Sequence, residues 1–211
     1  MGRTVAVLNR KGGVGKTTLA AHLGRAATLA GQRVLLVDAD PQGTLRDWHA
    51  AADGGQMELI AADTPASLSA ILTVKSAFDL VVIDGTAGIP VNSAAAARVA
   101  DAVLIPVQPS GFDLWSTHEV ADLVKARQAA TGGSPKAWLI LSRAITNSSI
   151  TREVERFLPE LGLPVIDARI SQRVVFAQAN SEGTTVLDRA PDSPAAHEVR
   201  RLYRELMREW A

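Results

Sequence analysis

The stretch VAVLNRKGGVGKTT, residues Val5 to Thr18, carries the strongest structural signal in the chain. It begins with a short apolar run typical of a buried strand, and a helical segment follows from Lys16 to Ala30. Between them lies a glycine-rich loop of the phosphate-binding pattern G-x-x-x-x-G-K-[ST], except that Arg10 occupies the position of the first glycine. A strand, such a loop and a helix in this order predict that backbone N–H groups converge on a phosphate at the helix N-terminus.

The loop residues have separate expected roles around a nucleoside triphosphate. We expect Lys16 to reach the β- and γ-phosphates and the hydroxyl of Thr17 to ligate Mg²⁺. A second lysine, Lys11, lies five residues upstream of Lys16, and two ammonium groups in one loop repel each other unless a polyanion lies beside them. A solvated surface lysine is the alternative reading. The predicted nucleotide-binding residues of the loop are Lys11, Gly12, Gly13, Val14, Gly15, Lys16, Thr17 and Thr18.

Apolar runs rich in β-branched residues recur along the chain and predict buried parallel strands. They are Val5–Leu8, Val34–Val37, Leu80–Ile83, Val103–Val107, Leu139–Leu141 and a weaker Val165-Ile166. The helical segments between them carry start signals: Thr64-Pro65 and Ser193-Pro194 resemble N-caps followed by proline, and Ser116 with Glu119 has the form of a capping box. The alternation predicts an α/β fold, a doubly wound, mostly parallel sheet flanked by helices, of the P-loop NTPase type. We expect residues 1–211 to form a single ATPase domain.

The composition excludes several classes of function. The chain has 211 residues, 47% of them hydrophobic, and no cysteine, which excludes disulfides, thiol catalysis and cysteine-ligated zinc or iron–sulfur sites. No apolar run approaches the length of a membrane span and no signal-peptide pattern is present, so we expect a cytoplasmic protein without stable membrane association. The formal net charge is zero, so a contact with DNA or a membrane would need a local basic patch.

Carboxylates follow two further predicted strands. Asp38 and Asp40 come after the second strand and Asp84 after the third, where a metal-coordinating acid belongs in this fold. We assign Asp84, and as a further candidate Asp38, to the Mg²⁺ shell through water, and Asp40 to the orientation of the attacking water. Solvated strand ends are the alternative. The predicted catalytic residues are therefore Lys11, Lys16 and Asp40. The chain has no Asn-Lys-x-Asp element of the guanine-selective kind, which favours ATP.

Five segments together resemble the ParA-type DNA-partition ATPases, whose phosphate loop is a deviant Walker A motif: Asn9–Thr18, Val34–Gly43, Phe78–Gly85, Val103–Trp115 and Ile170–Val186. PVQPSGFDLW, Pro106 to Trp115, and the run Leu45-Arg46-Asp47-Trp48 resemble the small ParF-like branch. The signature lysine of that family falls on Lys11, which by resemblance crosses a homodimer that sandwiches two ATP molecules. The resemblance further implies slow, Mg-dependent, partner-stimulated ATP hydrolysis.

The same resemblance implies partners and a location. The ATP state is expected to bind duplex DNA non-specifically, to associate with the nucleoid, and to meet a centromere-binding, ParB-like protein during plasmid or chromosome segregation. Ser171 and Arg173 fall where relatives line the adenine. On the last predicted helix, Ala195 to Trp210, a row of arginines is the candidate DNA contact, with an ordinary solvated face as the alternative: Arg200, Arg201, Arg204 and Arg208.

Two departures from the family and two rival functions remain. Asp84-Gly85-Thr86-Ala87-Gly88 lacks the prolines that many relatives carry after this aspartate, and the chain begins at its first predicted strand, so we expect no N-terminal helix-turn-helix. The chief rival function is a MinD-like ATPase recruited to a membrane, or an ATPase that positions a protein cluster. A metabolic enzyme of the same fold is third: amide-forming ligases give no reason for Lys11, and nitrogenase-type reductases need cysteine ligands.

Overall fold

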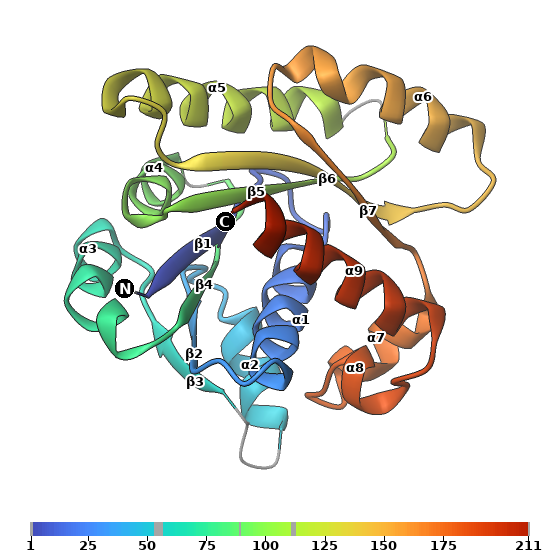
Figure 1. Ribbon diagram of the computed structural model, residues 1–211, viewed down its shortest axis with the longest axis horizontal. Coiled ribbons are helices and arrows are strands. Elements are labelled where there is room, and N and C mark those ends of the chain that lie inside the picture. Colours follow the sequence, from blue (N-terminus) through green and yellow to red (C-terminus); the bar gives the residue numbers. More distant parts are fainter. Residues whose placement is uncertain (1, 53–56, 89, 111–112, 211) are drawn as a thin grey trace.

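A computed structural model describes residues 2–52, 57–88, 90–110 and 113–210, with the side chains of 113–115 left aside. Its sheet has the strand order β3-β2-β4-β1-β5-β6-β7, and each pair of neighbours is parallel (Figure 1). The strands are β1 Arg3–Val7, β2 Val34–Asp38, β3 Glu58–Ala61, β4 Leu80–Asp84, β5 Ala102–Val107, β6 Lys136–Ala144 and β7 Val165–Ser171. The predicted parallel α/β fold is confirmed.

Helices cover both faces of the sheet (Figure 1). One face carries α1 Lys16–Leu29, α2 Thr44–Ala51, α7 Val174–Ser181, α8 Val186–Arg189 and α9 Pro194–Glu209. The other carries α3 Pro65–Val74, α4 Pro90–Val99, α5 Asp113–Thr131 and α6 Ser149–Phe157, with the short 3-10 turns Lys75–Ala77 and Leu158–Leu161. The sheet is therefore the middle of three layers.

Side-chain alternation along the central strands builds a core on each face. In β1, Val5 and Val7 pack under α1 and α9, whereas Ala6 points to the opposite core. In β4, Val82 belongs to the same core as Val5 and Val7, and Val81 belongs to the opposite core with Ala6. All of these side chains are buried, as expected for parallel strands covered on both sides.

Both predicted N-caps are confirmed, whereas the predicted capping box is wrong. Thr64 accepts a hydrogen bond from the Ser67 N–H, and Ser193 accepts one from the Ala196 N–H. The capping box at Ser116 fails because α5 already begins at Asp113, so Ser116 lies within the helix.

The strand β3 is absent from the predictions, and β7 extends well beyond the predicted pair Val165-Ile166. Both are edge strands of the sheet, and their partly exposed, mixed side chains lack the apolar run that marks a central strand. Across the described segments, no helix combines the length and apolar character that a membrane crossing requires.

Candidate nucleotide site

The glycine-rich loop joins β1 to α1 at the carboxyl edge of the sheet. Gly13 and Gly15 have φ values of 80° and 93°, a left-handed backbone that glycine adopts without strain. A Cβ atom on Gly15 would also lie 2.9 Å from the Oγ atom of Ser142. The loop can therefore fold back only with glycine at this position, as the phosphate-loop pattern predicts.

Lys16 lies inside the loop rather than in solvent. Its Nζ atom donates to the main-chain carbonyl of Lys11 at 2.9 Å, and its side chain is buried. Burial lowers the pKa of Lys16, while the nearby carboxylates of Asp84 and Asp40 act in the opposite direction. The ammonium group thus lies between the loop and the acidic strand ends, where the prediction places the triphosphate.

Asp84 ends β4 beside the loop, and its backbone is in register with Asp38 of β2. Its side chain is 1% exposed, and neither carboxylate oxygen has a hydrogen-bond partner of ordinary geometry. The pKa of Asp84 is raised to about 7, chiefly by burial; the Thr17 hydroxyl and Lys16 act to lower it, and the charges of Asp38 and Asp40 act to raise it. A buried carboxylate without a partner is costly unless a cation compensates it.

The donors near Asp84 fit a magnesium ion that is shared with phosphate. Mg²⁺ takes one or two protein oxygens together with water and substrate phosphates. Thr17 and Asp84 supply such oxygens. The described residues contain no group of three or more His, Cys, Asp or Glu that could hold a metal ion by themselves.

Asp38 has a different setting from Asp84. One of its oxygens accepts from the Asp40 N–H at 3.0 Å, and the other accepts from the Arg46 N–H and Nε at 3.0 and 3.1 Å. Arg46 also donates to the carbonyl of Asp40 at 3.0 Å. These contacts engage both oxygens, so the geometry favours Asp38 as the anchor of the Asp40 loop over a metal ligand. Asp40 itself is half-buried at the mouth of the site.

Two residues at the start of the loop, for which no role was predicted, hold it to the neighbouring elements. Asn9 is fully buried and donates to the carbonyl of Pro106 in β5, while its own side-chain oxygen accepts the Lys11 N–H. Arg10, at the deviant position, forms an ion pair with Glu119 of α5. A polar residue directly after a buried strand was the available signal for Asn9.

The loop is also held from its outer side. The Oγ atom of Ser142 donates to the carbonyl of Val14 at 2.8 Å, and a guanidinium nitrogen of Arg143 donates to the carbonyl of Gly13 at 2.6 Å. Both residues come from the end of β6, well over a hundred positions from the loop in sequence. No local pattern in the sequence could have indicated these contacts.

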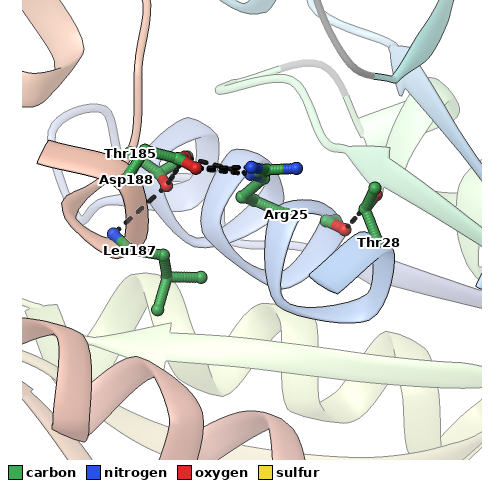
Figure 2. Close-up of polar contacts among 6 residues, drawn as sticks. Arg25, Thr28, Thr185, Leu187 and Asp188 are labelled. Atoms are coloured by element: carbon green, nitrogen blue, oxygen red, sulfur yellow. Dashed lines mark hydrogen bonds and ion pairs between the residues drawn. The ribbon is translucent and has the colours of Figure 1, made fainter. Parts of the chain in front are cut away.

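Helix α1 is fixed along its length to the segment that contains α7 and α8. Asn180 donates to the hydroxyl of Thr18 at 3.0 Å. Figure 2 shows the next anchor, in which Arg25 of α1 meets the carboxylate of Asp188, which also accepts from Thr185. Since Thr18 is a predicted nucleotide-binding residue, the segment with α7 and α8 helps to position the predicted site.

His22 lies between these two anchors. Its Nε2 accepts the Val186 N–H at 3.0 Å, so its Nδ1 carries the proton and donates to the carbonyl of Thr18 at 2.7 Å. Complete burial lowers the pKa of His22 to about 4, although the Thr18 carbonyl and Asp188 act against this shift. The histidine is therefore neutral and structural.

A cavity of about 330 Å³ opens beside this part of α1, between it, α2 and the end of α7. Its lining residues are Thr17, Thr18, Ala21, Thr44, Asp47, Trp48, Ala51, Asn180 and Ser181. Two of these residues, Thr17 and Thr18, also belong to the predicted nucleotide site. Trp48 forms its wall and donates its indole N–H to the carbonyl of Thr184 at 3.1 Å.

The two predicted adenine residues are joined through a third side chain. Glu198 of α9 accepts from the backbone N–H and hydroxyl of Ser171 at 2.9 and 2.8 Å, and from Arg173 at 2.8 Å. Ser171 ends β7 at the same edge of the sheet as the loop. The structure thus brings both residues to the carboxyl edge and shows that Glu198 holds them.

The candidate DNA arginines lie on α9. Arg201, Arg204 and Arg208 are exposed, whereas Arg200 is half-buried and donates to the carbonyl of Pro191 at 2.6 Å. Three acidic residues, Glu198, Glu205 and Glu209, alternate with these arginines in the sequence and would reduce the positive charge of the helix. Two of them are turned inward: Glu198 contacts Ser171, and Glu205 accepts the backbone N–H groups of β7 at Asp167 and Ala168.

Comparisons with known proteins agree with this geometry. Two relatives carry the name "Maintenance of carboxysome distribution protein A": that of Gloeobacter kilaueensis is 37% identical over 99% of this chain and 95% of its own length, and that of Halothiobacillus neapolitanus is 31% identical over 97% and 96%. The chromosome-partitioning ATPase Soj of Thermus thermophilus is 29% identical over 97% and 95%.

Solved structures share the fold. Apo McdA of Cyanothece superposes with a TM-score of 0.83 over the whole of both chains at 18% identity. Cobyrinic acid a,c-diamide synthase of Mycobacterium smegmatis, solved with an ATP analogue and magnesium, has a TM-score of 0.79 at 24% identity and covers 100% of this chain and 96% of its own.

A family model matches most of the chain, from β1 to the end of the segment that follows α7. It is the CbiA model, described as the CobQ/CobB/MinD/ParA nucleotide binding domain, and it matches residues 5–186. That range includes the glycine-rich loop, both acidic strand ends and the β7–α7 region. The chain belongs to the CobQ/CobB/MinD/ParA family of P-loop ATPases.

Proposed function

We propose that this protein is an ATP-driven switch that distributes a large protein assembly within the cell. It binds Mg-ATP at the glycine-rich loop, pairs with a second copy in that state, and is reset by hydrolysis. The observation that carries the proposal is the similarity, over almost the entire chain, to two relatives named for carboxysome distribution at 31% and 37% identity. This favours the protein-cluster alternative over replicon partition as the output of the switch.

The proposed chemistry uses the residues at the strand ends. Lys16 leaves the carbonyl of Lys11 to bind the phosphates. Thr17 directly, and Asp84 through water, would hold Mg²⁺, which would neutralise charge on the phosphates. Asp40 orients the attacking water, and the Arg46 clamp fixes the loop that carries it. Hydrolysis is slow without a stimulating partner, because a group on that partner or a loop movement is needed to complete this arrangement.

The lysine at position 11 is proposed to act across the dimer. Its main-chain carbonyl accepts a hydrogen bond from Lys16 of the same loop. Its side chain adds a positive charge that the triphosphate of a second copy would compensate. Two loops facing each other, each with one ATP, supply that charge. Ser171 and Arg173 are proposed to lie beside the adenine, with Glu198 setting their orientation.

We further propose that the ATP-bound dimer binds duplex DNA without sequence preference. Arg201, Arg204 and Arg208 are exposed on the outer surface of α9 and are the proposed phosphate contacts. Arg201 lies 4.0 Å from Glu205 and Arg208 pairs with Glu209 at 2.8 Å, so DNA phosphates would compete with these acids. Such contacts are sequence-independent and weaken as salt rises. The cargo would then follow a gradient of bound ATPase through an adaptor protein that stimulates hydrolysis.

DNA partition is the second candidate, and the similarity to the chromosome-partitioning ATPase Soj favours it at 29% identity. In that case the adaptor is a centromere-binding protein and the cargo is a replicon. The nucleotide cycle is the same in both cases. Only the identity of the cargo separates them.

Deletion of the gene in its own host separates the two cargoes. Replicon inheritance is scored by plating and by fluorescent origin foci, and large protein assemblies are located by cryo-electron tomography. Clumped or unevenly inherited assemblies with normal replicon inheritance would support the proposal. Replicon loss with evenly spaced assemblies would overturn it in favour of partition.

A further inference from the structure

The end of β6 contains an irregularity that the nucleotide chemistry described above leaves unexplained. Ser142 is in register with Ile170 of β7, and Ala144 with Ser171, so β6 advances two residues where β7 advances one. Arg143 is the extra residue. Its φ is 54°, a left-handed backbone that side-chain-bearing residues rarely adopt.

The irregularity directs a long side chain onto the phosphate loop. Bulges next to active sites commonly re-aim a side chain, and here the guanidinium of Arg143 reaches the carbonyl oxygen of Gly13 at 2.6 Å. The preceding residue, Ser142, is buried and donates to the next carbonyl, that of Val14, at 2.8 Å. Two consecutive residues of β6 therefore hold two consecutive carbonyls of the loop.

The direction of these carbonyls matters for an anion site. A loop that binds phosphate must point its N–H groups inward, and its carbonyl oxygens must then point outward and be satisfied there. A carbonyl that turned inward would repel the phosphate. Donors fixed on the outer side of Gly13 and Val14 oppose that rotation.

The strain at Arg143 is held by its surroundings. A non-glycine residue in this region costs on the order of 1 kcal/mol. The pairing of β6 continues past it, because the Gln172 N–H donates to the carbonyl of Ala144 at 2.8 Å. Backbone strain that is maintained beside a functional loop is a sign of a positional requirement.

We propose that Arg143 is a positioning residue that keeps the phosphate loop in its anion-binding form, through the carbonyl of Gly13 and together with Ser142. It acts on the phosphates through the loop and does not select the base. The inference rests on the nucleotide site of the proposed function and adds a determinant of its affinity.

The test compares variants that separate backbone from side chain. Arg143→Gly and Arg143→Asn both tolerate the left-handed backbone but cannot reach Gly13, whereas Arg143→Lys keeps a cation of similar reach. Arg169→Gln is the matched control, because Arg169 lies on the adjacent strand and pairs with Glu155 away from the loop. Thermal unfolding without nucleotide checks that each variant is folded.

Affinity is measured by calorimetry for ATP, ADP and inorganic tripolyphosphate with Mg²⁺. We expect Arg143→Gly and Arg143→Asn to weaken all three by about tenfold, a common cost of a lost charge-assisted hydrogen bond. Arg143→Lys should recover part of the loss, and Arg169→Gln should bind like the wild type. Nucleotide-free stability of Arg143→Gly should not fall.

Two outcomes would overturn the inference. Unchanged affinity in both short variants would show that the loop needs no support from Arg143. A loss confined to ATP and ADP, with tripolyphosphate unaffected, would assign Arg143 to the adenosine instead. If the wild type itself bound neither ATP nor tripolyphosphate, the nucleotide site and the proposed function would fail first.

Discussion

The Nζ atom of Lys16 donates to the main-chain carbonyl of Lys11 at 2.9 Å, so the two lysines of the phosphate loop meet through a backbone atom. A substitution that removes the Lys11 side chain leaves this hydrogen bond available. The contribution of the Lys11 ammonium group can therefore be measured separately from the integrity of the loop.

Lys11→Ala is expected to abolish ATP-dependent dimerisation while nucleotide binding by the monomer stays close to that of the wild type. The reason is that its ammonium group is proposed to meet the partner's ATP, whereas Lys16 serves its own. Light scattering coupled to size exclusion, with ATP and with Asp40→Ala to slow hydrolysis, measures the dimer. Lys16→Ala is the control and should lose nucleotide binding. Normal dimerisation of Lys11→Ala would contradict the proposal.

Asp84→Asn is expected to stabilise the nucleotide-free protein at pH 8. The raised pKa of Asp84, about 7 against an ordinary value of 3.8, means that the folded state holds a proton more firmly than the unfolded state. Its contribution to stability is present at low pH and is lost as the pH rises to about 7 and above. Removal of the charge should raise the unfolding free energy at pH 8 by up to about 4 kcal/mol, the equivalent of this difference in pKa.

The same substitution should remove the additional thermal stabilisation that Mg²⁺ gives to the ATP complex. Urea unfolding at pH 5 and pH 8, in the presence of a chelator, provides the first measurement, and thermal shifts with ATP provide the second. A variant that is less stable than the wild type at pH 8 would show that the carboxylate is satisfied in the free protein.

His22 has the opposite pH dependence. Its pKa is lowered to about 4. As the pH falls from 6.5 to about 4, the unfolded state therefore binds a proton at this histidine whereas the folded state does not. The contribution of neutral His22 to the free energy of unfolding is fully present above pH 6.5 and is lost as the pH falls, with a loss of about 2 kcal/mol at pH 5. His22→Gln should lack this loss. Because Asp84 acts in the reverse direction over the same range, the comparison must be the difference between variant and wild type at each pH. Parallel curves would contradict the assignment.

Arg46→Ala is expected to lower the unfolding free energy by about 2–3 kcal/mol, because it leaves the completely buried carboxylate of Asp38 without its charged partner. It should also reduce kcat more than nucleotide affinity, since it releases the Asp40 loop. Arg46→Lys should restore part of both. Arg152→Ala, at an exposed position on α6, is the stability control and should change little. An equal effect of the two alanine substitutions would refute the anchoring role.

Arg204→Ala is expected to weaken duplex DNA binding in the ATP state about equally for all sequences and to reduce the salt dependence by about one phosphate contact. Fluorescence anisotropy from low to moderate salt measures both. The neighbouring Arg200 is bonded to the carbonyl of Pro191, so Arg200→Ala serves as a positional comparison. An unchanged salt slope in Arg204→Ala would exclude α9 as the DNA surface.

The sequence was sufficient for those parts of the fold and site that depend on local patterns. The central strands are uniform apolar runs, and Gly15, Lys16 and Thr17 form a contiguous motif whose spacing alone specifies the loop. Asp84 could be found because an acid at the end of a buried strand is costly unless a cation or a ligand compensates its charge. The edge strand β3 could not be predicted from the sequence, because an exposed strand has no distinctive composition.

The supports of the site were beyond prediction because they join residues that are distant in the chain. Ser142 and Arg143 act on the loop through tertiary contacts, and the bulge that makes this possible is defined only by pairing with β7. Glu198 and Glu205 show the related limit for charge: a helix sequence gives the number of acids but not the direction in which each one points.

The two acids of α9 have a consequence for the behaviour of the protein at high concentration. β7 is the last strand of the sheet, and the backbone N–H groups at Asp167, Ala168 and Ser171 are taken by Glu205 and Glu198, about two helical turns apart. An open strand edge is a template for pairing with another chain, and charged side chains that occupy it prevent self-assembly. Helix α9 therefore covers the β7 edge of the sheet, so that another copy of the protein finds fewer free backbone N–H groups there to pair with.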